Sequence, residues 1–132
     1  MVNIHTVAVI GSGTMGAGIA EVAASHGHPV LVYDIDAAAI SRAVDGIRQR
    51  LSSRVARGKL SADAGEQILA RLTPVTNISA LAKADLVIEA ASERLEVKKA
   101  LFTQLAEVCP PQTLLASNTS SISVTAVAAS WR

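Results

Sequence analysis

A glycine-rich turn constrains the fold of this chain more than any other feature of its sequence. Residues 11–16 read Gly-Ser-Gly-Thr-Met-Gly, and they follow a short apolar run at residues 7–10. Residues 14–27 are rich in alanine and end at a glycine, which is typical of a helix with glycine just beyond its last turn. A strand, a tight turn and a helix in this order begin a βαβ unit. The sequence therefore predicts an α/β fold with a parallel sheet.

Each glycine of the turn has its own physical reason. Gly11 permits the tight turn, Gly13 lets the backbone approach a pyrophosphate, and Gly16 lets the helix pack close to the sheet. The helix that follows presents free N–H groups and a partial positive charge to an anion. The predicted cofactor-binding residues of the turn are Gly11, Ser12, Gly13, Thr14, Met15 and Gly16. The alternative is a glycine turn that serves packing alone.

Asp34 ends the second apolar run, residues 29–33, and stands 18 residues after Gly16. A carboxylate at this place accepts both hydroxyls of an adenosine ribose and repels a 2′-phosphate, which favours NAD over NADP. The residues directly after it are Ile35 and Asp36, so no arginine follows at once to bind a 2′-phosphate. Asp36 is the better candidate for a helix N-cap. Because FAD uses the same fingerprint, the turn alone does not select the redox cofactor.

The remaining pattern predicts a Rossmann-type, doubly wound parallel sheet within one domain, residues 1–132, with a helical hairpin between the second and third strands. Strands are expected at 7–10, 29–33, 75–76, 85–90 and 113–116, and helices at 14–27, 37–57, 61–72, 95–108 and 124–129. An open sheet that stops after its fifth strand has an unpaired edge. We therefore expect a fragment of a longer polypeptide; the alternative is a natural domain of 132 residues.

Composition excludes several other classes of protein. The chain has 12 basic and 11 acidic residues, a net charge of +1, and one cysteine, Cys109. This balance gives no general attraction to nucleic acid, and a single cysteine excludes an internal disulfide framework and a cysteine-rich zinc site. No apolar run is long enough to span a membrane, and no secretion signal precedes the first strand. We expect a cytoplasmic domain without a metal.

A basic stretch lies within the predicted hairpin. Residues 46–62 contain five cations and no acid, namely Arg48, Arg50, Arg54, Arg57 and Lys59. A local cationic surface suits a phosphorylated ligand other than the dinucleotide. A solvated helix face near a helix C-terminus, where cations are favourable, explains the same residues.

Three segments together resemble the NAD-binding domain of 3-hydroxyacyl-CoA dehydrogenases: VAVIGSGTMGAGIA, DLVIEAASERLEVKKALF and LLASNTSSIS. The resemblance implies NAD as cofactor, with Asp34 on the ribose, Glu93, Lys98 and Asn118 near the cofactor, and Ser120 beside it, bonded to the 3-oxygen of the substrate. It also implies coenzyme A phosphates at Arg57 and Lys59. From the residues alone, the SNTSS segment is an N-cap cluster, and Glu93 and Lys98 are a surface pair. The segment from residue 107 to 123 is similar to bacterial enzymes of phenylacetate breakdown that act on 3-hydroxyadipyl-CoA.

The implied reaction is the reversible, NAD-dependent oxidation of an L-3-hydroxyacyl-CoA to the 3-ketoacyl-CoA, as in the β-oxidation of fatty acids or aromatic acids. The catalytic histidine of the family and its helical second domain, which usually forms a homodimer, correspond to positions beyond residue 132. His5, His26 and His28 are no substitutes, since they belong to the other end of the predicted sheet. We therefore expect the chain alone to bind NAD and to turn over negligibly. A non-catalytic NAD-binding regulatory module and another Rossmann 3-hydroxyacid dehydrogenase are the alternatives.

Overall fold

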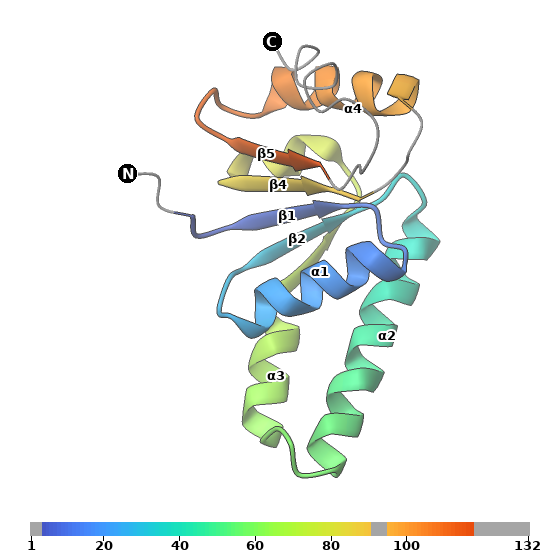
Figure 1. Ribbon diagram of the computed structural model, residues 1–132, viewed down its shortest axis with the longest axis vertical. Coiled ribbons are helices and arrows are strands. Elements are labelled where there is room, and N and C mark those ends of the chain that lie inside the picture. The colour runs from blue at the N-terminus through green and yellow to red at the C-terminus, as the bar shows by residue number, and fades with distance from the viewer. Residues whose placement is uncertain (1–3, 91–94, 118–132) are drawn as a thin grey trace.

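A five-stranded parallel sheet forms the centre of the molecule (Figure 1). The computed structural model describes residues 4–90 and 95–117, except for the side chains of residues 95–98 and 117. The strands follow the order β3-β2-β1-β4-β5, which is the doubly wound arrangement that the sequence predicts. Their bounds are β1 Val7–Ile10, β2 Val30–Tyr33, β3 Leu72–Val75, β4 Leu86–Glu89 and β5 Leu114–Ser117.

The middle strand, β1, is apolar throughout because both of its faces are covered. All four of its residues are buried. Its last residue, Ile10, pairs with Tyr33 of β2 on one side and with Glu89 of β4 on the other. The carboxyl ends of the three strands therefore meet at one edge of the sheet, where ligands of open α/β folds bind.

Helices cover the two faces of the sheet unequally (Figure 1). On one face lie α1 (Thr14–Ser25), α2 (Ala37–Ala56) and α3 (Ala62–Ala70), packed in one apolar core with β1, β2 and β3. On the other face lie α4 (Leu95–Val108) and the short 3-10 helix η1 (Ile78–Lys83). Phe102 and Leu105 of α4 are fully buried there with Leu81 of η1, and Cys109 fills the same core as a small apolar residue.

The predicted helical hairpin is present between β2 and β3, and local sequence signals set its bounds. The Asp36 carboxylate accepts from the Ala38 N–H at 3.0 Å and caps α2. Gly58, with φ of +74°, turns the chain after α2, since a left-handed conformation there favours glycine. The Ser61 hydroxyl then accepts from the Ala64 N–H at 3.1 Å and caps α3.

Some predicted bounds were wrong. The third helix ends at Ala70 rather than residue 72, and the third strand is Leu72–Val75 rather than residues 75–76. Pro74 lies inside this strand because β3 is at the edge of the sheet, where a missing N–H costs no ladder bond. Strand β5 lies one residue later than predicted, and η1 was not predicted. The helix predicted at 124–129 lies outside the described residues.

No helix among the described residues has the length and apolar character needed to cross a membrane.

Candidate functional site

The glycine turn has the geometry that its sequence predicts. Gly11 has φ of +98°, a conformation that favours glycine, and its N–H donates to the Tyr33 carbonyl oxygen at 2.8 Å. A Cβ on Gly16 would overlap the Gly11 carbonyl oxygen. Two predictions are thereby confirmed: Gly11 makes the tight turn, and Gly16 allows α1 to pack closely on the end of β1.

Gly13 has no such internal reason to be glycine. Its φ of −68° is ordinary for any residue, and a Cβ there would meet no described atom within 4 Å. It is the N-cap residue of α1, yet no side chain caps the helix at this position. Beside Gly13 the described part of the chain therefore leaves space at the positive end of the α1 dipole, which is the form of an anion-binding site.

Asp34 lies beside this helix N-terminus and is held by three hydrogen bonds. The Ser12 N–H and hydroxyl both donate to Oδ2 at 2.8 Å, and the Asp36 N–H donates to Oδ1 at 2.9 Å. Burial raises the pKa of Asp34, but these bonds and the charge of Arg42 outweigh burial and hold the pKa below its ordinary value of 3.8. The side chain is therefore a carboxylate at neutral pH. A carboxylate has about four acceptor positions, so beside these three bonds it can accept from one more donor, such as a ribose hydroxyl.

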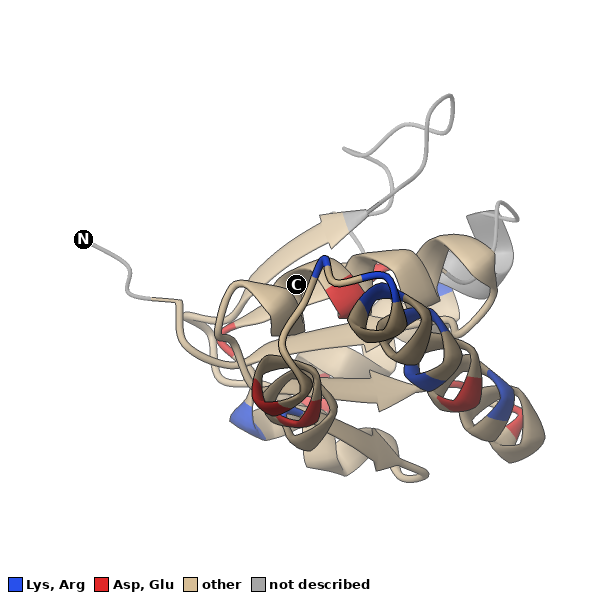
Figure 2. Cartoon of the chain, turned by 90° about the horizontal axis from the view of Figure 1, so that it is seen from below, with Lys and Arg blue, Asp and Glu red and all other residues tan. Residues whose placement is uncertain are grey.

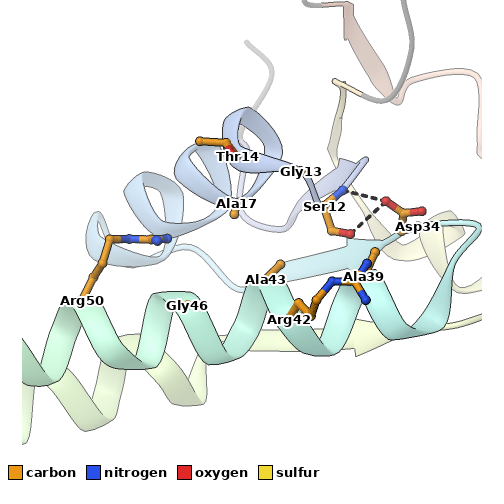
Figure 3. A pocket seen from close by; sticks show the side chains of 10 residues that line it. All are labelled: Ser12, Gly13, Thr14, Ala17, Asp34, Ala39, Arg42, Ala43, Gly46 and Arg50. Atoms are coloured by element: carbon orange, nitrogen blue, oxygen red, sulfur yellow. Dashed lines mark hydrogen bonds between the residues drawn. The ribbon is translucent and has the colours of Figure 1, made fainter.

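A cleft of about 460 Å³ joins the turn, Asp34 and one side of α2 (Figure 3). Small residues of α1 and α2 form much of its wall, and two arginines of α2 lie at different points along it. The lining residues are Ser12, Gly13, Thr14, Ala17, Asp34, Ala39, Arg42, Ala43, Gly46 and Arg50. Sequence reasoning missed Arg42 and Arg50 as cleft residues. Ala39, Arg42, Gly46 and Arg50 follow one another at intervals of three or four residues, which places them on one helix face and could have revealed the two arginines.

Basic residues, blue in Figure 2, recur along α2 and at the turn that follows it. The cations of the basic stretch divide into those that pair with an acid and those that do not. Arg48 pairs with Asp45 at 2.7 Å, and Arg50 pairs with the half-buried Glu21 of α1 at 2.7 Å. Arg54 lies 4.0 Å from the same glutamate. The remaining two cations, Arg57 and Lys59, are exposed at the hairpin turn and form no ion pair with any described residue. These two are the predicted coenzyme A residues.

Other predicted site residues fall beyond what the structure describes. Glu93, Asn118 and Ser120 lie outside the described residues, and Lys98 lies on α4 with its side chain outside the description. The three histidines are at the amino end of the sheet, as predicted. His5 precedes β1, and the His28 Nδ1 lies 3.0 Å from the His5 carbonyl oxygen. His26 follows α1, and its Nδ1 lies 2.8 Å from the Val22 carbonyl oxygen.

The sequence matches one family model over residues 6–132, and that model describes the NAD binding domain of 3-hydroxyacyl-CoA dehydrogenase. The chain belongs to this family. NAD is accordingly the cofactor of the domain. The residues that line the cleft fit this cofactor. An uncapped helix N-terminus suits the pyrophosphate, and the fixed carboxylate of Asp34 suits the hydroxyls of the adenosine ribose.

Relatives of this NAD-binding domain are longer proteins. It is 77% identical over 129 residues to the 3-hydroxyadipyl-CoA dehydrogenase of Escherichia coli K12, covering 98% of this chain and 27% of the relative. It is 40% identical over 126 residues to the 3-hydroxybutyryl-CoA dehydrogenase of Clostridioides difficile, covering 96% of this chain and 45% of the relative. The domain thus spans between about a quarter and a half of these proteins.

Solved structures show the same fold. A crystal structure titled 3-hydroxybutyryl-CoA dehydrogenase from Escherichia coli K12 matches with a TM-score of 0.94 and 77% identity, over 96% of the domain and 27% of that chain. The (S)-3-hydroxybutyryl-CoA dehydrogenase PaaH1 of Ralstonia eutropha matches with a TM-score of 0.92 and 37% identity, over 97% of the domain and 45% of that chain.

Proposed function

We propose that this chain is the NAD-binding part of a dehydrogenase that oxidises L-3-hydroxyacyl-CoA to 3-ketoacyl-CoA. The observation that carries the proposal is the fixed carboxylate of Asp34 beside the helix N-terminus at Gly13, where no described atom lies within 4 Å of an added Cβ. The helix N-terminus favours an anion, and the carboxylate favours hydrogen-bond donors. A dinucleotide offers both, since it has an anionic pyrophosphate and a ribose with two hydroxyl donors. Membership of the 3-hydroxyacyl-CoA dehydrogenase family supplies the reaction class.

In this proposal the chain binds and orients the cofactor and the substrate, and NAD supplies the hydride acceptor when it is bound. The backbone around Gly13 and the first turn of α1 hold the pyrophosphate. Asp34 accepts from a ribose hydroxyl, and Ser12 keeps that carboxylate in one orientation through two hydrogen bonds at 2.8 Å. Ser120 bonds the 3-oxygen of the substrate near the cofactor, while Glu93, Lys98 and Asn118 complete the cofactor site. These last four roles rest on the resemblance of their segments to the family.

The substrate side of the proposal is an acyl-CoA, with its phosphates at Arg57 and Lys59. Support comes from their exposure at the hairpin turn and from the lack of an ion pair with any described residue, which leaves both charges available to an anion. The name of the relative at 77% identity supports 3-hydroxyadipyl-CoA, an intermediate of phenylacetate breakdown, as the acyl group. A cytoplasmic homodimer of the longer protein completes the proposal.

Two measurements on the 132-residue chain test the proposal. Calorimetry with NADH should show binding, and absorbance at 340 nm with NADH and acetoacetyl-CoA should show negligible turnover. Turnover should be lower than that of full-length relatives by at least the 10²–10⁴-fold that a positioned base typically contributes, because no described histidine lies near the cleft. Absence of NADH binding by the folded chain would refute the cofactor site. Turnover near that of full-length relatives would refute the proposal that this chain binds the cofactor but does not supply the catalytic base.

Charge reversal tests the coenzyme A site. The double variant Arg57→Glu/Lys59→Glu should weaken binding of coenzyme A by about 10-fold or more while NADH affinity stays unchanged, because charge-assisted phosphate contacts are lost at the hairpin turn alone. The matched control is Arg48→Glu/Lys83→Glu, which reverses two exposed charges elsewhere and should leave coenzyme A affinity within about 2-fold of the unaltered chain. Equal effects of the two double variants would remove these residues from the proposal.

A further inference from the structure

The adenosine side of the cleft contains a cation that the sequence pattern did not connect with the cofactor. Arg42 lies on the second turn of α2 and lines the cleft together with Asp34. In Figure 3 its side chain extends along α2 toward the end of the helix near Asp34. Helical side chains lean toward the helix N-terminus, so an arginine eight residues after Asp34 returns to the same place.

Asp36 holds this arginine while it also caps the helix. Its Oδ1 accepts from the Ala38 N–H at 3.0 Å, and its Oδ2 lies 3.6 Å from an Arg42 guanidinium nitrogen. The two side chains of this pair are 57% and 70% exposed, so solvent screens their attraction. Asp36 therefore holds the guanidinium only weakly, and a more strongly charged partner would have to compete with Asp36 for it.

A 2′-phosphate is such a partner. It carries more charge than a carboxylate and accepts two parallel N–H bonds from a guanidinium. If the ribose hydroxyls meet Asp34, the 2′-phosphate of NADP would stand beside the same carboxylate, between its repulsion and the attraction of Arg42. Arg50, the other arginine of the cleft, is held by Glu21 at 2.7 Å and is not free to act in the same way.

We propose that Arg42 decides how strictly the site rejects the 2′-phosphorylated dinucleotide, and that Asp36 restrains Arg42 from binding that phosphate. This inference rests on the proposed NAD site and adds a second determinant of cofactor choice to Asp34. The carboxylate of Asp34 repels the phosphate directly. Arg42 attracts the phosphate and offsets part of that repulsion, and the ion pair with Asp36 limits how much it offsets.

Dissociation constants for NADH and NADPH, measured by fluorescence titration at low ionic strength, test the proposal. Asp36→Ser keeps an N-cap oxygen and removes the charge that holds Arg42, so NADPH affinity should rise about 10-fold relative to NADH affinity. Adding Arg42→Ala to this variant should cancel the gain. In an Asp34→Asn/Asp36→Ser background, where both the direct repulsion and the restraint on Arg42 are absent, Arg42→Ala should weaken NADPH binding at least about 10-fold and NADH binding by less than about 2-fold.

The same helix provides a matched control pair. Asp45 and Arg48 form a similar exposed ion pair at 2.7 Å, outside the cleft, and Asp45→Ser and Arg48→Ala should leave the ratio of NADPH to NADH affinity unchanged. Equal weakening of NADH and NADPH by Arg42→Ala would overturn the inference while leaving the NAD site intact. Failure of the unaltered, folded chain to bind NADH would instead overturn the proposed function.

Discussion

Gly13 and Gly16 are three residues apart in one turn and lack side chains for opposite reasons. A Cβ on Gly16 would overlap protein backbone, whereas a Cβ on Gly13 would enter open space. We expect Gly16→Ala to lower the free energy of unfolding by about 3 kcal/mol or more, since α1 would have to move away from β1. Gly13→Ser should keep or slightly raise that free energy, because serine is a preferred N-cap.

The variant that keeps its stability, Gly13→Ser, should nevertheless lose affinity for NADH. The serine side chain of Gly13→Ser occupies the space where the pyrophosphate approaches, so NADH affinity should fall about 10-fold or more. Urea denaturation gives the free energy of unfolding, and calorimetry with NADH gives the affinity. Unchanged NADH affinity in a well-folded Gly13→Ser chain would contradict the assignment of that space to the cofactor.

Asp34 links cofactor binding to acid stability. Its hydrogen bonds with Ser12 and Asp36 exist only in the folded state and lower its folded-state pKa below the ordinary value of 3.8. The stabilisation is therefore complete above the unfolded-state pKa and is lost as the pH falls through the lower, folded-state pKa. We expect Asp34→Asn to lower the free energy of unfolding at pH 7, and the deficit to shrink below about pH 4. A deficit of equal size at pH 7 and pH 3, measured by urea denaturation, would contradict this account.

Residue types and spacing predicted the glycine turn and the position of Asp34 at the end of the second strand. Both can be read from a few consecutive residues, because each directly follows an apolar run. The bonds from Ser12 to Asp34 depend instead on the pairing of β1 with β2, which brings residues 22 positions apart together. Arg42 was missed for a related reason. Its role depends on the direction of a long side chain rather than on its distance from Asp34 along the chain.

At the scale of elements, prediction succeeded where a signal is long or capped. Helix α4 has the predicted bounds, and α2 differs by one residue, since Asp36 and Gly58 mark its ends. Prediction failed at β3, because a proline argues against a strand only where the ladder needs its N–H, and edge position is a property of the whole sheet. The short helix η1 was missed since six residues are too few to show a helical period.

At the scale of the whole molecule, the two halves of the sheet are covered differently. On the α1 side, helices pack over β1, β2 and β3, and the surface beyond them includes a groove of about 670 Å³ between α1 and Ile88 of β4. Leu115 of β5 faces the opposite core, so Leu114 must face the α1 side by strand alternation, and it is 40% exposed. Val22 of α1, in the wall of the groove, is 58% exposed. An apolar surface thus continues from α1 across this half of the sheet.

This surface should reveal itself by its response to substitution. Val22→Gln should change the free energy of unfolding by less than about 0.5 kcal/mol, because the side chain is largely in solvent. It should also reduce fluorescence of a hydrophobic dye bound to the 132-residue chain, since polar atoms replace apolar ones in the groove wall. Ile47→Ala is the contrasting variant: Ile47 is 1% exposed in the core between α2 and the sheet, and its truncation should cost about 2–5 kcal/mol. Urea denaturation and dye titration check both variants. Destabilisation of the chain by Val22→Gln to a similar extent as by Ile47→Ala would contradict this exposure and show that Val22 is buried in solution. Concentration dependence of unfolding would then test whether another copy of the chain covers it.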